Sequence, residues 1–524
     1  MTKVTLVRPP GTKFKSYQQI IVAPPIGIAY LAGSLRAAGH QVSVIDALGE
    51  APFRREPCFN GRWVATGLSI GEIVARIPLD TEMIGVSCMF SQDWPYTRKV
   101  IETIRRSFPR ALIVAGGEHI TALPLFILDT CPEIDVCVLG EGEETIVEVA
   151  NCVASGADLS AGLNQLKGTA VRRGGKAVVN PERARLKDVE AIPRPAWDLI
   201  PIGTYLDHSL GCGVSRGRPM PILATRGCPY QCSFCSSPSM WTTRWGAREP
   251  AKVLDEIQEY IERYKATDLE FYDLTALMKK EWILTFARLI EERGLKFTWQ
   301  LPQGTRSEAL DAEVCQALYR TGCRNLTYAP ESGSPEALKR IKKRVSLDKM
   351  LASMRAARRE GIFPKANIII GFPDETRREV WQTVAFLARM GWAGVYDVWV
   401  YIFSPYPGSE LFKQLRERGK LPELNEEYFL SLASFVDLGV TISRCENLSS
   451  RELSRLRIAG YMAFYGMQYA RRPGRLLRTL YNAARNRQES RMDKTVHDFF
   501  QRIRGIGRQG TETGIAEASQ QATG

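Results

Sequence analysis

Short apolar runs alternate with helix-like segments along the first 150 residues. Five runs of strand length, rich in Val and Ile, occupy residues 4–7, 42–45, 83–87, 111–115 and 136–139. The segments between them have helical spacing, as residues 28–38 do before Gly39, a residue suited to end a helix. Strands that alternate with helices predict a parallel, doubly wound α/β sheet. Ligands of such sheets bind at the carboxyl ends of the strands.

The same alternation returns after residue 222. Strand-like runs lie at residues 222–225, 269–272, 297–300, 326–329, 366–370 and 395–403, with helical spacing between them. Polar residues or glycines follow each run. They are Cys228, Asp273, Arg306 and the segments 331–333, 371–376 and 404–409.

Changes in composition divide the chain into five regions. The two strand–helix regions are predicted as domains over residues 1–150 and 216–420. Residues 151–215, with charged segments, prolines and glycines, predict a linker with little core. Residues 421–510 predict a basic helical region, and the small polar residues 511–524 predict a disordered tail.

Length and cysteine usage bound the class of protein. A chain of 524 residues is too long for one ordinary core, which agrees with two or three domains. No apolar run approaches the roughly 18 residues of a membrane span, and the N-terminus enters a strand-like run without a signal peptide. The 12 Cys show no disulfide spacing, so reduced thiols in a cytoplasmic protein are expected.

The positive charge is concentrated near the C-terminus. Residues 441–510 hold 15 Lys or Arg against 5 Asp or Glu, which is about ten of the net charge of +13. Arg471, Arg472, Arg475, Arg478, Arg485, Arg487 and Arg491 are interleaved with Leu476, Leu477, Leu480 and Tyr481. One interpretation is the solvated face of a helical cap; the alternative is a surface for anionic lipid, peripheral to a membrane, or for an acidic partner. No recognition motif supports nucleic-acid binding, so a nucleic-acid partner is not expected.

Three cysteines stand close together after the first strand of the second region. The run is Cys228-Pro-Tyr-Gln-Cys232-Ser-Phe-Cys235, so the thiols sit at offsets of four and three. Three thiolates suit a 4Fe–4S cluster in which one iron stays open for a small ligand. Structural zinc is the alternative, with Cys212 or His208 as the fourth ligand that zinc normally takes.

The cysteine run resembles the cluster motif of the radical S-adenosylmethionine (SAM) enzymes. The resemblance implies an open partial (β/α)6 barrel, whose chemistry lies at the carboxyl ends of its strands. It implies that Cys228, Cys232 and Cys235 hold the cluster, whose open iron binds SAM. The residues it places near SAM are Phe234 at the adenine, Glu331 at the ribose and Arg306 at the carboxylate, together with Asp273 and Ser332. For Asp273 and Arg306 a structural ion pair is an equal alternative.

The first region resembles the Rossmann-like cobalamin-binding domain that precedes many radical SAM enzymes. The resemblance rests on residues 24–31, 39–40, 116–119 and 140–145. It implies that cobalamin is bound by Gly27, Ser87, Gly116, Gly117, Glu118, Gly140, Glu141 and Gly142. Many cobalamin modules supply a cobalt-ligating His from an Asp-x-His-x-x-Gly loop, but residues 46–51 contain no His. His40 and His119 are expected to have structural roles.

Together the two resemblances imply a cobalamin-dependent radical SAM enzyme. The favoured activity is methyl transfer to an unactivated carbon of a small-molecule or lipid-like substrate, through methylcobalamin and a 5′-deoxyadenosyl radical. No catalytic side chain is assigned. An external electron donor of the flavodoxin or ferredoxin type is expected. The alternatives are ring formation, as in the anaerobic Mg-protoporphyrin monomethyl ester cyclases, and a non-catalytic cobalamin or iron–sulfur sensor.

Overall fold

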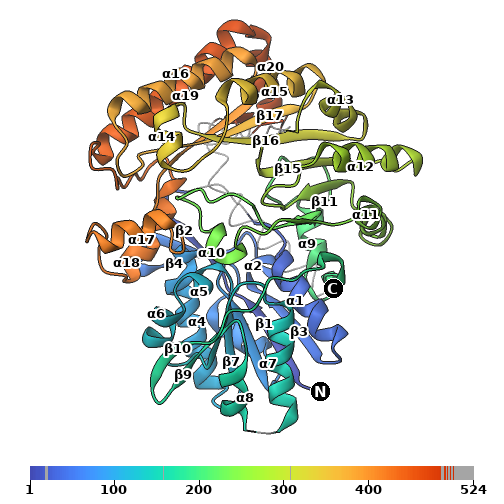
Figure 1. The fold of residues 1–524 in the computed structure, drawn as a ribbon, viewed down its shortest axis with the longest axis vertical. Helices are drawn as coiled ribbons and strands as arrows, with labels where there is room; N and C mark the ends of the chain where they lie inside the picture. The colour runs from blue at the N-terminus through green and yellow to red at the C-terminus, as the bar shows by residue number, and fades with distance from the viewer. Residues whose placement is uncertain are drawn as a thin grey trace.

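Two large sheets, each built mainly of parallel strands, organise the chain and lie one above the other in Figure 1. The computed structural model describes residues 1–17, 22–156, 158–306 and 309–485, and a few positions between 489 and 500. The predicted tail 511–524, like Arg487 and Arg491, lies outside the described residues. The short helix α10 (Ser237–Trp241) lies between the two sheets.

The N-terminal sheet contains all five predicted strands. They are β1 (Lys3–Arg8), β3 (Gln41–Asp46), β6 (Met83–Ser87), β7 (Leu112–Gly116) and β8 (Val136–Val138), mutually parallel in the order β3-β1-β6-β7-β8. The direction of winding reverses between β1 and β6, and ligands of open α/β sheets bind at such a switch point. The doubly wound prediction is confirmed.

The sheet continues into the segment predicted as a linker. Strands β9 (Thr169–Arg173) and β10 (Lys176–Val179) add to it antiparallel, and Ala170 and Val171 are buried in the cores on its two faces. Gly174 and Gly175 form the two-residue turn between them, both with positive φ, the geometry of a hairpin turn. A core-forming hairpin therefore occupies part of residues 151–215, where little core was expected.

The second sheet has six parallel strands in chain order. They are β11 (Pro219–Ile222), β14 (Asp268–Phe271), β15 (Thr298–Thr305), β16 (Cys323–Glu331), β17 (Phe363–Ile370) and β18 (Asp397–Ile402). Helices α11 (Pro250–Tyr264), α12 (Lys280–Glu292), α13 (Ala312–Arg320), α15 (Leu347–Arg359) and α16 (Arg377–Ala393) connect them. This is the predicted partial (β/α)6 barrel, with β11 and β18 at its edges.

The first barrel strand ends earlier than the apolar run that predicted it. The run spans residues 222–225, but β11 stops at Ile222. The buried carboxylate of Asp273 accepts the N–H groups of Ala224 and Thr225. These two amides therefore bond to a side chain where the chain leaves the barrel sheet, and Thr225 and Arg226 pair instead with Ala247 and Gly246 in a short two-stranded ladder.

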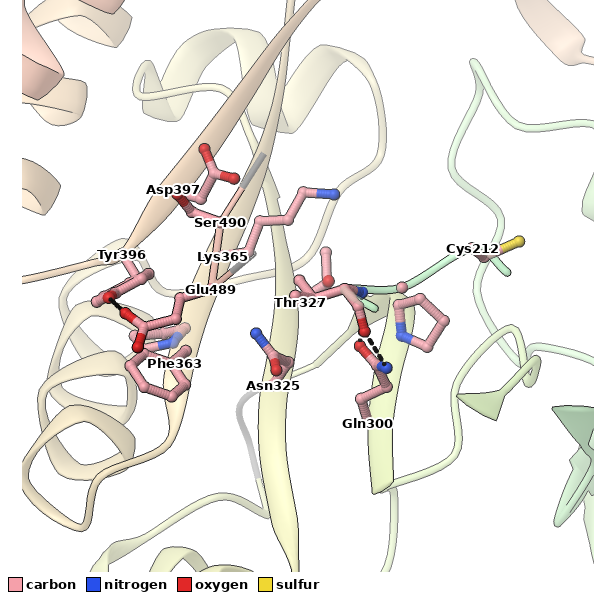
Figure 2. Close-up of a pocket in the computed structure, with 14 residues that line it drawn as sticks. Cys212, Gln300, Asn325, Thr327, Phe363, Lys365, Tyr396, Asp397, Glu489 and Ser490 are labelled. Carbon is pink, nitrogen blue, oxygen red and sulfur yellow. Dashed lines mark hydrogen bonds between the residues drawn. The ribbon is translucent and has the colours of Figure 1, made fainter. Parts of the chain in front are cut away.

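A glycine-rich segment closes the amino end of the barrel. Cys212 and Gly213 donate their N–H groups to the Glu270 carboxylate at 2.8 and 2.9 Å, and Val214 exchanges two hydrogen bonds of 2.9 Å with the Gln300 amide. Figure 2 shows Gln300 and Cys212 on one side of a cavity of about 20 Å³, which has room for about one water. Burial raises the pKa of Glu270 to about 7.

The C-terminal helices join both domains. Helix α19 (Ser450–Arg471) packs along α16, and its Leu453 and Phe464 belong to the barrel core. Helices α17 (Glu410–Glu417) and α18 (Glu426–Ser431) instead bury Phe412 and Phe429 in the core of the N-terminal domain. Among the described helices, none combines the length and the apolar character needed to span a bilayer.

The glycine-rich segment is packed too closely to accept a side chain at Gly213. A Cβ at Gly213 would lie 2.3 Å from the Gln300 Oε1 atom and 2.6 Å from Glu270 Oε1, both held by hydrogen bonds. We expect Gly213→Ala to lower the free energy of unfolding by about 1–3 kcal/mol, measured by urea denaturation. Gly71→Ala is the matched control, because that helical Cβ meets no atom within 4 Å; it should leave stability unchanged or raise it by about 0.5–1 kcal/mol. Equal effects of the two variants would contradict the tight packing inferred here.

Candidate functional site

The cysteine loop leaves the barrel where Asp273 ends the first strand. Gly227 has φ +83°, and a Cβ there would lie 2.1 Å from the Arg244 carbonyl oxygen, so only glycine fits. Further on, Ser233 donates its N–H to Ile341 O at 3.0 Å and accepts the Leu411 N–H at 2.8 Å. The loop is thus fixed from several elements of the barrel.

Two of the three thiols open on the same large cavity. Cys232 and Cys235 line a space of about 860 Å³, together with Ala122 and Leu123 of the N-terminal domain and residues of α17. Burial raises the pKa of the Cys235 thiol to about 11, and burial also raises that of Cys232. A space of this size is within the range of cofactor and substrate sites.

The three thiols of the loop are suitable ligands for an iron–sulfur cluster, although they do not converge on one point. Three cysteines follow one another on one fixed loop, and two of them face the cavity. Within the described residues, no three His, Cys, Asp or Glu side chains are arranged to hold a metal ion. The predicted fourth zinc ligands also lie elsewhere: Cys212 is in the segment at the amino end of the barrel, and His208 packs against Phe53. Ligation by Cys228, Cys232 and Cys235 stays a prediction.

The predicted SAM residues surround the cysteine loop, mostly with partners of their own. Arg306 stacks on Tyr230 of the loop at 3.7 Å and donates to the Arg344 carbonyl oxygen. Glu331 is paired with Lys343 at 3.0 Å. Phe234 packs against Phe372.

Asp273 and Ser332 are engaged by the chain itself. The Asp273 carboxylate braces the strand end described above, and burial raises its pKa to about 6. It is therefore in neither the predicted ion pair nor an open position. The buried Ser332 hydroxyl bonds to the Thr383 hydroxyl at 3.1 Å and accepts the Ser334 N–H.

Two predicted cobalamin residues instead bind residues outside the first domain, one in the second domain and one in the segment predicted as a linker. Glu118, at the start of α5 (Glu118–Ala122), accepts a short hydrogen bond from Ser236, the residue after Cys235. Glu141 accepts two hydrogen bonds of 2.9 Å from the Arg185 guanidinium. The neighbouring Glu143 forms a 2.6 Å ion pair with the buried Arg226, two residues before Cys228. The Glu118–Ser236 and Glu143–Arg226 pairs join the two domains directly.

The predicted glycines lie at the carboxyl edge of the N-terminal sheet. Gly116 ends β7, and a Cβ on Gly117 (φ +109°) would lie 2.5 Å from the Cys88 carbonyl oxygen. Gly140 also has positive φ, and Gly142 precedes α7 (Glu143–Ser155). Ser87 ends β6, and Gly27 in α1 (Ile26–Ala37) is exposed with open space before its Cβ position. These residues share one edge, so a large ligand could approach the backbone there.

Neither His of the first domain lies in residues 46–51, the segment that corresponds to the loop from which many cobalamin modules supply a cobalt ligand. The position of the missing loop His is occupied by Leu48, which is buried in the core. His40 bonds to Thr2 N and Asn151, at the amino end of β1. His119 bonds to Ser91 at 2.9 Å and packs against Trp94, and burial lowers its pKa to about 3. Both His residues thus have hydrogen-bond partners within the domain, while the buried Nε2 atom of His119 has none among the described residues. That neither His ligates cobalt stays a prediction.

Lys343 was missed by the sequence analysis. Its side chain is only 9% exposed, and its pKa is raised because the nearby Glu331 and Cys232 outweigh the effect of burial. Its segment, Lys342-Lys343-Arg344, reads as an ordinary exposed basic run. Only the fold shows that one of these three cations lies inside, against the cysteine loop.

Comparison with known families agrees with both halves of the site. Residues 22–150 match the B12 binding domain, and residues 222–387 match the radical SAM superfamily. The first match covers the sheet edge with the glycines, and the second begins at the end of β11, just before the cysteine loop.

Individual relatives cover most of the chain. An uncharacterized methyltransferase of Pyrococcus horikoshii is 28% identical over 88% of this chain and 92% of its own. The anaerobic magnesium-protoporphyrin IX monomethyl ester cyclase of Cereibacter sphaeroides is 27% identical over 78% of this chain but 63% of its own length. The fold matches that of the radical SAM methyltransferase TsrM of Kitasatospora setae, solved with cobalamin and a [4Fe-4S] cluster bound, with a TM-score of 0.60 at 19% identity over 80% of this chain and 78% of that one. The chain is therefore a cobalamin-dependent radical SAM enzyme, whose cofactors are a 4Fe–4S cluster, SAM and cobalamin.

Proposed function

We propose that the enzyme transfers a methyl group to an unactivated carbon of a small-molecule or lipid-like substrate. The observation that carries this proposal is the shared cavity, where Cys232 and Cys235 of the cysteine loop face α5 of the B12-binding domain. A substrate in this space would lie between the two domains. When bound, the cofactors supply a 5′-deoxyadenosyl radical and a transferable methyl group.

The relatives favour methyl transfer over ring formation. The methyltransferase relative aligns over nearly its full length, whereas the cyclase relative extends well beyond the part that this chain matches. A non-catalytic sensor has less support, because these relatives are enzymes. Ring formation remains the second candidate because the cyclase has comparable identity.

The chain's own residues would hold the two domains, and with them the reacting groups, in a fixed relative position. Glu118 and Ser236 tie the cysteine loop to the sheet edge with the glycines, and the Arg226–Glu143 ion pair holds the same two parts. We propose that Lys343 balances the negative charge of Glu331 and of a Cys232 thiolate. We propose that Arg306, held over Tyr230, faces the carboxylate of SAM, since a guanidinium fork matches that group.

Two partners belong to the proposal. An external donor of the flavodoxin or ferredoxin type would supply the electron. A peripheral contact with an anionic membrane is supported by α20 (Pro473–Ala484), which exposes Leu476, Leu477, Leu480 and Tyr481. The basic residues of this helix are less available than the sequence predicted, because Arg475 is buried and Arg478 is paired with Glu489.

The cysteine assignment can be tested by iron content. Anaerobically reconstituted protein should hold about four irons and cleave SAM with a chemical reductant, and Cys232→Ala should lose both, because three thiolates are needed to hold the cluster. Cys212→Ala is the control, since that residue lies at the amino end of the barrel, and it should keep both. A Cys232→Ala protein that retains the iron and the cleavage would overturn the assignment.

The reaction class can be tested by the products of SAM. Protein loaded with both cofactors would be incubated with a reductant, methyl-labelled SAM and a small-molecule extract of its source cells. We expect both S-adenosylhomocysteine and 5′-deoxyadenosine, with label in a new compound, because methyl transfer consumes SAM in two ways. Substrate-dependent 5′-deoxyadenosine without S-adenosylhomocysteine would favour ring formation.

A further inference from the structure

Four arginines line another cavity, which lies at the opposite end of the barrel from the cysteine loop. The cavity, of about 180 Å³, lies where the chain enters β18, next to Gly394 and Tyr396. Its arginines come from two elements: Arg358 from the last turn of α15, and Arg472, Arg475 and Arg478 from the start of α20. No Asp or Glu among the described residues lines it.

Arg475 is the most constrained of the four. It is only 8% exposed, and its guanidinium stacks on the Tyr396 ring at 3.8 Å. Its Nη2 atom donates to Ser490 at 3.0 Å and lies 3.6 Å from Asp493. The buried Nε and Nη1 atoms have no hydrogen-bond partner in the described part of the chain. Buried donors of a charged group are costly to leave unpaired, so these two atoms indicate a missing acceptor.

Of the other three arginines, Arg358 and Arg472 add charge that no described acidic side chain balances. Arg472 donates to the Trp392 carbonyl oxygen at the end of α16, and its pKa is lowered by burial and by the nearby Arg358 and Arg471. Arg358 stands 5.9 Å from the Tyr396 ring and forms no ion pair with any described residue. Only Arg478 and Arg475 have acidic neighbours, Glu489 and Asp493. Figure 2 shows Glu489 turned toward the Tyr396 hydroxyl, with which it shares a hydrogen bond.

The backbone adds to the attraction for an anion. Helix α20 begins at Pro473, and the side chain of its N-cap residue, Arg472, forms no capping bond. The N-terminus of a helix carries a partial positive charge and free N–H groups. Here Pro473 has no N–H and the Arg475 N–H donates to the Arg472 carbonyl oxygen at 2.8 Å, which leaves the N–H of Gly474. Nothing lies within 4 Å of the Cβ position of Gly474, so a ligand has open access to this turn. Guanidinium forks and helix N-termini are the groups that bind phosphate in proteins.

We propose that this cavity binds a phosphate group, either of a soluble phosphate compound or of a phospholipid head group. Arg358 and the free Nε and Nη1 atoms of Arg475 donate to its oxygens. The exposed Leu476 and Leu477, one turn further along α20, would contact the acyl chains of a lipid. The site lies at the end of the barrel opposite the cofactors, so it goes beyond the proposed methyl transfer and does not depend on it.

The test uses the full-length protein with two kinds of probe. Inorganic pyrophosphate would be titrated by calorimetry at low salt. Vesicles of phosphatidylcholine, with and without phosphatidic acid, would be used in cosedimentation. The variant is Arg358→Gln, chosen because Arg358 is half-buried and has no ion pair to lose among the described residues. The matched control is Arg359→Gln, the next residue of α15, which is exposed and does not line the cavity.

Wild-type protein and Arg359→Gln should bind at least one probe, with affinity falling as salt rises. Arg358→Gln should bind at least about tenfold more weakly, because it loses a charge-assisted contact to phosphate. Binding of pyrophosphate identifies a soluble ligand, whereas binding of phosphatidic acid vesicles alone identifies a lipid head group. Failure of the wild type to bind either probe, or equal binding by the two variants, would overturn the proposal. Thermal melting would confirm that each variant is folded.

Discussion

The buried carboxylate of Asp273 determines where the barrel ends and the cysteine loop begins. By accepting the amides of Ala224 and Thr225, it stops the first strand and directs the chain toward the tight turn at Gly227. The turn sets the start of the cysteine run, and the contact between Ser236 and Glu118 sets its end. The position of the thiols relative to the first domain thus depends on a carboxylate that touches none of them.

The strands of both sheets could be predicted because a parallel strand that is buried on both faces consists of consecutive apolar residues, which is a local feature of the sequence. The five parallel strands of the N-terminal sheet and the six strands of the barrel all overlap the predicted runs. The hairpin at residues 169–179 was missed although its signal, Gly174-Gly175 between two short apolar runs, is local. The strand end at Ile222 could not be predicted, because Asp273, which causes it, is some fifty residues further along the chain.

The sequence analysis predicted which residues lie at the candidate site, but not which residues they contact. Glu118 and Glu141 lie at the predicted sheet edge, yet they face Ser236 and Arg185. Lys343 stands in a run of three cations, and nothing local distinguishes the one that is buried. The same holds for the C-terminal arginines, where Arg475 is buried and Arg478, on the same helix, is exposed. Pairing between distant segments is a property of the fold, so single-residue patterns do not report it.

The route of the chain after the barrel has a consequence for how the protein folds and evolves. Helices α17 and α18 follow the last barrel strand, yet Phe412, Tyr428 and Phe429 are buried in the core of the first domain. The first domain is therefore discontinuous: residues beyond 410 complete a core begun by residues near the N-terminus. During synthesis this core stays open until the barrel has been made, so the two domains are expected to unfold as one cooperative unit. A gene fragment encoding the first domain alone would lack these aromatic side chains and expose the apolar residues that they cover, which limits the exchange of that domain between proteins as an independent module.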